Sequence, residues 1–187
     1  MTWFVRVPAS SANLGPGFDV LGMALSIDAD VGIEGVGASD HEPPERGRWI
    51  DDHHPAAVAF HRGGGVGRLW LRSSIPIGRG LGFSGAVRCA GIAAAFAQRA
   101  EGLIDPNDLP EMLAIVAGLE GHPDNGAASL YGGIVASAAG ETVRITTPLR
   151  PSVVAWVPGF ETATAHSRSK LAAVVRFEDA AFNASAG

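Results

Sequence analysis

Residues 75–84 read Ile75-Pro-Ile-Gly-Arg-Gly-Leu-Gly-Phe-Ser84 and lie between an expected strand at 69–71 and an expected helix at 84–100. Alanines recur at helical spacing after the loop, which predicts the helix. Glycines let a main chain approach a ligand closely, and the N–H groups at the start of a helix attract anions. The stretch therefore favours a phosphate site, with the Ser84 hydroxyl as a candidate ligand for a phosphate-bound Mg²⁺. It is not a Walker A loop, because no Gly-Lys-Ser/Thr follows, and taken alone a tight structural turn explains it about as well.

Short strands and helices alternate through the rest of the chain. Residues 8–17 have turn chemistry, and residues 37–55 read as an exposed connection. Asp108 followed by Glu111 is a capping-box pattern that begins a helix. We expect strands at 4–7, within 18–36, and at 134–136, 142–145 and 153–157. We expect helices at 56–61, from 108 onward and within 164–186.

A second polar cluster reads Glu120-Gly-His-Pro-Asp-Asn125 and puts two carboxylates, an imidazole and an amide around a proline. Glu120 could hold the cation that bridges ATP phosphates, while Asp124 and Asn125 could bind or orient a polar substrate. The alternative is a solvated turn whose Asp and Asn cap the next helix. For Asn13 and Asp19, the corresponding alternative is an Asx-turn.

Composition excludes several classes of function. The net charge is −5 and Lys170 is the one lysine among 187 residues, which disfavours nucleic-acid binding. The one cysteine, Cys89, excludes an internal disulfide and a cysteine-based zinc site, and its alanine-rich surroundings indicate a core residue. No apolar run approaches the roughly 18 residues that cross a bilayer, so we expect no membrane partner and a cytoplasmic location.

Several separated segments together resemble homoserine kinases of the GHMP superfamily. Residues 8–22, Pro-Ala-Ser-Ser-Ala-Asn-Leu-Gly-Pro-Gly-Phe-Asp-Val-Leu-Gly, are similar to the opening motif of that family. Residues 76–84 resemble its phosphate loop, and residues 120–125, followed by Gly132-Gly133, resemble its third motif. Residues 164–168, Thr-Ala-His-Ser-Arg, with Leu171 resemble a fourth segment in which Ser167 replaces an alanine.

The resemblance implies an α+β fold of the ribosomal protein S5 domain 2-like kind. Residues 1–157 would form the N-terminal ATP-binding domain, and residues 158–187 would begin an incomplete C-terminal domain. The implied reaction converts ATP and L-homoserine to ADP and O-phospho-L-homoserine, a step toward threonine. Apolar surface left exposed without the rest of the second domain would favour self-association, such as a homodimer.

The resemblance also implies roles for individual residues. Ser84 and Glu120 would bind Mg²⁺, and Asp19, Asp124 and Arg168 would be the catalytic residues. The hydroxyl proton would pass to Asp19, to Asp124 or to the phosphate itself. The residues implied around the ATP phosphates are Pro76, Gly78, Arg79, Gly80, Leu81, Gly82, Phe83 and Ser84. Those implied for the homoserine pocket are Asn13, Asp19, His122, Asp124, Asn125 and Arg168, the last as a clamp for the substrate carboxylate.

Departures from the family pattern leave two other functions open. Phe83 and Gly85 stand where the family has serine and alanine, and Gly126 stands where it has valine. Residues 52–55 lack the asparagine expected on the adenine side. The chain could therefore be a GHMP kinase for another small alcohol. The family's C-terminal domain carries a further glycine-rich loop and a substrate-binding arginine, and we expect this chain to hold only the beginning of that domain. The chain could therefore also be a non-catalytic nucleotide-binding domain.

Overall fold

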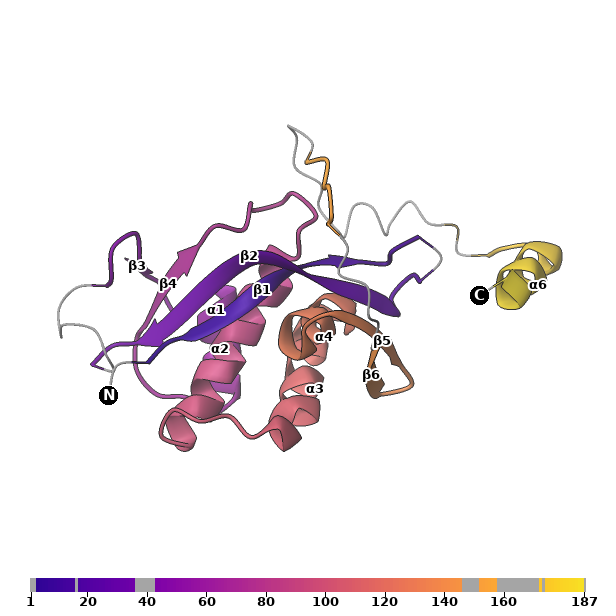
Figure 1. The fold of residues 1–187 in the computed structure, drawn as a ribbon. Helices are drawn as coiled ribbons and strands as arrows, with labels where there is room; N and C mark the ends of the chain where they lie inside the picture. The colour runs from indigo at the N-terminus through magenta and orange to yellow at the C-terminus, as the bar shows by residue number, and fades with distance from the viewer. Residues whose placement is uncertain are drawn as a thin grey trace.

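Two layers make up the fold, an antiparallel sheet and a set of helices on one of its faces (Figure 1). The computed structural model describes residues 3–15, 17–35, 43–145, 152–157, 172 and 174–186. The strands are β1 (Val5–Ala12), β2 (Leu21–Ile33), β3 (Arg48–Trp49), β4 (Leu69–Ser73), β5 (Ile134–Ala138) and β6 (Glu141–Ile145). The helices are α1 (Pro55–Arg62), α2 (Phe83–Arg99), η1 (Pro106–Asp108), α3 (Leu109–Glu120), α4 (Asp124–Tyr131) and α6 (Phe177–Ala186). This arrangement confirms the α+β class.

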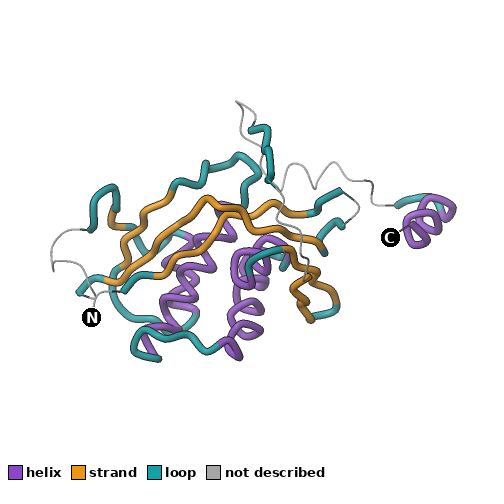
Figure 2. Tube along the Cα trace, in the orientation of Figure 1, coloured by secondary structure: helices purple, strands orange, loops and turns teal. Residues whose placement is uncertain are grey.

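The long strand β2 organises the sheet. One edge of β2 pairs with β1 along most of its length, across an irregularity between Pro8 and Ala9. The other edge is shared, because residues 21–23 pair with β5 and residues 29–33 pair with β4. β3 and β6 add to the two ends, giving the order β3-β4-β2-β5-β6 with β1 beside β2. In Figure 2, which has the orientation of Figure 1, β1, β2 and β4 run above the helices and the β5–β6 hairpin lies beside them.

Helix α2 forms the centre of the helical layer. Its residues from Gly85 to Ala97 are buried except Arg88, and Cys89 is fully buried as expected. Burial raises the pKa of the Cys89 thiol well above its ordinary value. Small side chains allow this close packing, because a Cβ added to Gly91 would lie only 2.0 Å from the carbonyl oxygen of Ala56 in α1.

The structure corrects several sequence-based predictions. β1 continues to Ala12 through residues expected to form a loop, because these residues pair with β2 beyond the irregularity. The Asp108 side chain makes no capping hydrogen bond to α3, whereas Asp105 caps η1 by accepting from the Asn107 amide. β3 lies in the expected connection, and α4 is the helix that only the alternative interpretation of residues 120–125 included.

Residues 152–157, expected to include a strand at 153–157, form no regular structure and are exposed. Part of the expected helical region is α6, whose described side chains are exposed and which lies apart from the two layers in Figure 1. The motif at 164–171, including Arg168, lies outside the described residues. Among the helices that the structure describes, none combines the length and apolar character needed to cross a bilayer.

Two glycine-to-alanine substitutions should separate the effect of helix packing on stability from the effect of helix propensity. We expect Gly91→Ala to lower the free energy of unfolding by about 1–3 kcal/mol, because the new methyl group collides with the α1 backbone. Gly118→Ala in α3 is the matched control, since a Cβ there meets nothing within 4 Å, and it should stabilise by about 0.5–1 kcal/mol. Urea unfolding followed by circular dichroism measures both. Equal effects of the two changes would contradict the close α1–α2 contact.

A buried carboxylate links three strands on the sheet face opposite the helices. Ala29 and Val31 belong to the core, so strand alternation turns Asp30 away from the helical layer. The Asp30 side chain is 6% exposed and accepts hydrogen bonds from Arg6 Nε at 2.8 Å and Arg72 Nη2 at 2.8 Å. Burial raises the pKa of the Asp30 carboxyl, but the two guanidinium groups outweigh this effect and hold the pKa below its usual value.

A lowered pKa means that Asp30 contributes stability above the unfolded-state value near 3.8, and that this contribution disappears as pH falls through the lower folded-state value. We expect Asp30→Asn to cost about 2 kcal/mol at neutral pH and to flatten the loss of stability below pH 4. Unfolding free energies measured between pH 2 and 7 test this, with the exposed Glu34→Gln as control. An unchanged acid profile in Asp30→Asn would contradict the assignment.

Candidate nucleotide and substrate site

The glycine-rich loop connects β4 to α2 and packs against β1. Gly78, Gly80 and Gly82 all have positive φ angles, between 67° and 71°, which only glycine adopts readily. Leu81 is buried and anchors the loop, and its carbonyl oxygen accepts a hydrogen bond from the Ser10 amide at 3.3 Å. A Cβ on Gly82 would lie 2.1 Å from Ser10 Oγ, so the loop touches the strand at this residue.

The loop places the start of α2 beside the end of α3. Gly82 is the N-cap of α2 and supplies no capping side chain, so the first amide groups of the helix have no side-chain cap among the described residues. Ser84 Oγ donates a hydrogen bond of 2.8 Å to Glu120 Oε1, the last residue of α3. The guanidinium of Arg88, one turn further along α2, contacts both Ser84 Oγ and Glu120 Oε1.

Helix α4 contributes the second polar group of the site. His122 Nδ1 lies 2.5 Å from Asp124 Oδ1, which also accepts the Asn125 amide at 2.8 Å. Asp124 is 1% exposed and sits in the first turn of α4, where a carboxylate interacts favourably with the helix dipole. Asn125 Oδ1 accepts a hydrogen bond from Ser10 Oγ at 2.9 Å, which ties α4 to β1. The segment 120–125 is therefore a helix junction, not a solvated turn.

The opening motif reaches the same place from the β1–β2 connection. Asn13 Oδ1 accepts the amide of Asp19 at 3.0 Å, and both residues have left-handed backbone conformations. One ligand atom each from Asp19, His122 and Asp124 lies within 4.8 Å of the others. Such a group of two carboxylates and an imidazole could hold a metal ion or a substrate ammonium group.

A cavity of about 300 Å³ joins the loop, the α3–α4 junction and the end of β1. Most of the residues named from sequence line it, while Pro76 does not and Asp19 borders the neighbouring cavity. Two helix N-termini, those of α2 and α4, open onto this space, which favours anions. The predicted residues along its wall are Asn13, Gly78, Arg79, Gly80, Leu81, Gly82, Phe83, Ser84, Glu120, His122, Asp124 and Asn125.

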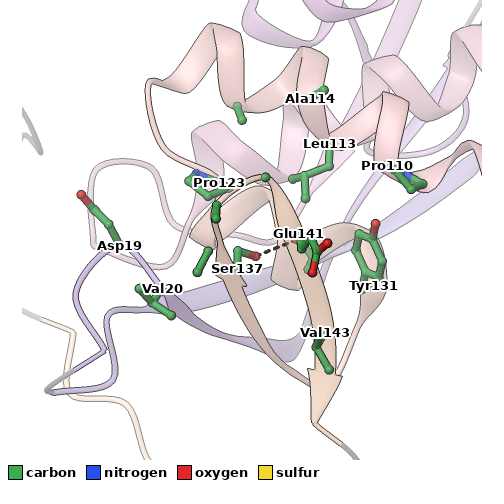
Figure 3. Close-up of a pocket in the computed structure, with 15 residues that line it drawn as sticks. Asp19, Val20, Pro110, Leu113, Ala114, Pro123, Tyr131, Ser137, Glu141 and Val143 are labelled. Carbon is green, nitrogen blue, oxygen red and sulfur yellow. Dashed lines mark hydrogen bonds between the residues drawn. The ribbon is translucent and has the colours of Figure 1, made fainter. Parts of the chain in front are cut away.

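A larger cavity of about 830 Å³ lies between α3 and the β5–β6 hairpin (Figure 3). Its wall is mainly apolar, with Leu113 on one side and Val143 on the other. Asp19, which lies near His122 and Asp124, also lines this cavity. Ser137 and Thr142 share a hydrogen bond of 2.9 Å across the hairpin. Burial raises the pKa of the Tyr131 hydroxyl in the same wall. The glycine loop does not reach this cavity.

Three of the four departures from the family pattern have local explanations. Phe83 packs partly against the core while also lining the small cavity. A Cβ on Gly85 would lie 3.1 Å from Asn125 Cβ, and a Cβ on Gly126 would lie 2.9 Å from Val116 Cγ1. The two glycines thus permit α2, α3 and α4 to approach closely.

Sequence reasoning missed two residues of the site. Ser10, which positions Asn125, was read as part of a loop, although it belongs to the opening motif. Arg88 was not singled out, although it lies four residues after Ser84 and so on the same face of the helix.

Comparison with known proteins shows which class of protein shares this fold. The family model described as the GHMP kinases N terminal domain matches residues 53–133. The mevalonate kinase structure from Methanococcus jannaschii, 13% identical, shares the fold with a TM-score of 0.54 over 79% of this chain and 56% of that one. The fold and the loop-and-helix site therefore resemble an N-terminal domain of the GHMP kinase class.

Relatives with higher sequence identity identify the family within this class. The homoserine kinase of Rhodococcus opacus is 36% identical over 100% of this chain and 68% of its own length, and that of Moorella thermoacetica is 39% identical over 97% and 64%. The structure of a putative homoserine kinase from Listeria monocytogenes is 31% identical, with a TM-score of 0.70 over 97% of this chain and 65% of that one. The chain belongs to the homoserine kinase family. It spans about two thirds of the length of these relatives.

Two glycines of the loop provide a matched test of its contact with β1. Gly80→Ala and Gly82→Ala both force alanine to a positive φ, at a cost of about 1–2 kcal/mol. Only the second change also collides with Ser10, since a Cβ on Gly80 meets nothing within 4 Å. We expect Gly82→Ala to cost about 1–3 kcal/mol more than Gly80→Ala and to weaken ATP binding further. Thermal unfolding and calorimetry measure the difference, and similar values for both variants would contradict the contact.

Proposed function

We propose that this chain forms the nucleotide-binding part of a homoserine kinase, which transfers the γ-phosphate of ATP to the hydroxyl of L-homoserine. One observation carries the proposal: the hydrogen bond between Ser84 and Glu120 joins the glycine loop to the α3–α4 junction at a single cavity. Three motifs that are far apart in the sequence thus meet where phosphate and acceptor would react. The choice of L-homoserine as the acceptor rests on the names of the relatives, which are homoserine kinases.

The phosphate side of the cavity consists of the loop and the start of α2. In the proposed complex, main-chain amides near Gly80 and Gly82 would surround the triphosphate, and Ser84 and Glu120 would hold Mg²⁺. Hard oxygen donors suit this ion, and the two oxygen atoms lie 2.8 Å apart. When bound, the ion would neutralise charge on the phosphate oxygens.

The acceptor side consists of Asn13, Asp19, His122, Asp124 and Asn125. The carboxylates would attract the ammonium group of an amino acid and lie within reach of the hydroxyl proton. Asp124 is held by His122 and by the Asn125 amide, so its position is fixed before substrate binds. Positioning and charge stabilisation are the main requirements of phosphoryl transfer, and no covalent nucleophile is needed.

The remaining assignments stay predictions within this proposal. Arg168 would clamp the substrate carboxylate, and residues 1–157 would be the ATP-binding domain, with 158–187 beginning the C-terminal domain. A cytoplasmic location and a homodimer also stay predictions.

A coupled assay of ADP release tests the proposed reaction. With ATP and Mg²⁺ present, L-homoserine should raise ADP release well above the rate without an acceptor. Glu120→Ala should lower this rate by about 100-fold, because it removes a carboxylate that would hold the Mg²⁺ ion on the phosphates. Glu111→Ala is the matched control, since Glu111 is exposed in the first turn of the same helix, and it should leave the rate unchanged.

Other outcomes distinguish the alternatives. A higher rate with a different small alcohol than with L-homoserine would assign another acceptor. ATP binding by calorimetry without acceptor-dependent ADP release would make the chain a nucleotide-binding domain. Absence of both binding and turnover would refute the proposal.

A further inference from the structure

A half-buried arginine occupies the place between the two proposed metal ligands. Arg88 lies on α2 one turn after Ser84, and its side chain is 19% exposed. Its Nη1 atom contacts both Ser84 Oγ and Glu120 Oε1, and Glu120 itself is 10% exposed. One guanidinium nitrogen therefore satisfies the same two oxygens that would hold a divalent cation.

We propose that Arg88 fills the cation position of the phosphate site and competes with a divalent metal ion for Ser84 and Glu120. Arg88 would thereby determine how tightly this site binds metal. This inference rests on the proposed nucleotide site. It states that the loop carries its own positive charge, so a Mg²⁺ ion held by Ser84 and Glu120 in the proposed complex must first displace Arg88 from these oxygens, and its binding adds little to the affinity for the nucleotide.

The competition follows from charge and from shared atoms. The Arg88 guanidinium brings a positive charge to the place where the metal ion would bind. A divalent ion that takes Glu120 Oε1 and Ser84 Oγ must displace the Nη1 donor from both atoms. One carboxylate also cannot neutralise both cations, and the shielding of the pair from water strengthens their repulsion.

The surroundings of the arginine show that these two contacts hold it. Arg88 Nε is buried and has no hydrogen-bond partner among the described residues. An unpaired buried donor disfavours this placement of the side chain, so the contacts with Ser84 and Glu120 must outweigh it. Arg88 also contacts the Ser84 carbonyl oxygen at 3.4 Å, which keeps the guanidinium over the first turn of α2.

A purely structural role for Arg88 makes a different prediction. An ion pair that only links α2 to α3 would change stability when removed, and the metal affinity would stay the same. Competition instead raises the metal affinity when the arginine is removed. Metal binding in the absence of nucleotide therefore separates the two roles without any measurement of activity.

The first experiment titrates the protein with Mn²⁺ alone and follows free Mn²⁺ by electron paramagnetic resonance. Arg88→Met, which keeps the length of the side chain and removes its charge, should bind Mn²⁺ roughly tenfold or more tightly than the wild type. Arg99→Met is the matched control, because Arg99 lies at the exposed end of the same helix and stacks on Phe96. It should leave Mn²⁺ binding unchanged.

Arg88→Gln serves as a second variant if Arg88→Met fails to fold, which circular dichroism would reveal. It keeps a hydrogen-bond donor beside Glu120 and loses the positive charge, so it should also tighten Mn²⁺ binding. Equal Mn²⁺ affinity in the wild type and a folded Arg88 variant would overturn the inference, as would an equal gain in Arg99→Met.

A second measurement needs no variant. Calorimetry with wild-type protein should give ATP affinities in excess EDTA and in excess Mg²⁺ that agree within about threefold, because the cation position is already filled. A gain of more than tenfold with Mg²⁺ would overturn the inference while leaving the proposed function intact. Absence of ATP binding under both conditions would refute the proposed function, and the Mn²⁺ titrations would still decide whether Arg88 competes with metal.

Discussion

The close approach of α2 to its neighbours is the constraint on which the site depends. A side chain at Gly91 would collide with α1, and side chains at Gly85 and Gly126 would crowd Asn125 and Val116. Without these glycines, α2 would stand further from α1 and α4, and α4 would stand further from α3. The hydrogen bond of 2.8 Å between Ser84 and Glu120 requires that spacing. Helix packing in this chain therefore contributes to the geometry of the site together with the glycine loop.

The second constraint is the contact of the loop with β1. Ser10 meets the loop through the Leu81 carbonyl and meets α4 through Asn125, so a single residue of the strand positions both sides of the cavity. Ser10 is fully buried, and its hydroxyl hydrogen bond is part of the framework of the site. Because β1 pairs with β2 along most of its length, this framework extends into the centre of the sheet.

The sequence predicted the elements whose signals are local and failed where distant pairing decides. Alanine spacing predicted α2, and the glycine loop before it was placed correctly, because both depend on neighbouring residues. The strand β1 was predicted too short, since Pro8 and the small polar residues after it resemble a turn until β2 pairs with them. Conversely, Val153 and Val154 suggested a strand, yet they find no partner within the described residues. The motif residues of the site were recognised by resemblance, whereas Arg88 was missed because one arginine in a helix usually lies on its solvated face.

The two halves of the site carry opposite electrostatic character, and this separation suits a reaction between a polyphosphate and an amino acid. The start of α2 offers main-chain amides and the Arg88 guanidinium, while the acceptor side offers the carboxylates of Asp19 and Asp124. Anionic and cationic groups of two reactants could then bind side by side without either passing through a region of like charge. Glu120 lies at the boundary, and its pairing with Arg88 prevents its negative charge from facing the phosphate side alone. The overall charge of −5 is thus a poor guide to the phosphate site, because a local arrangement of amides and one half-buried guanidinium determines the field there.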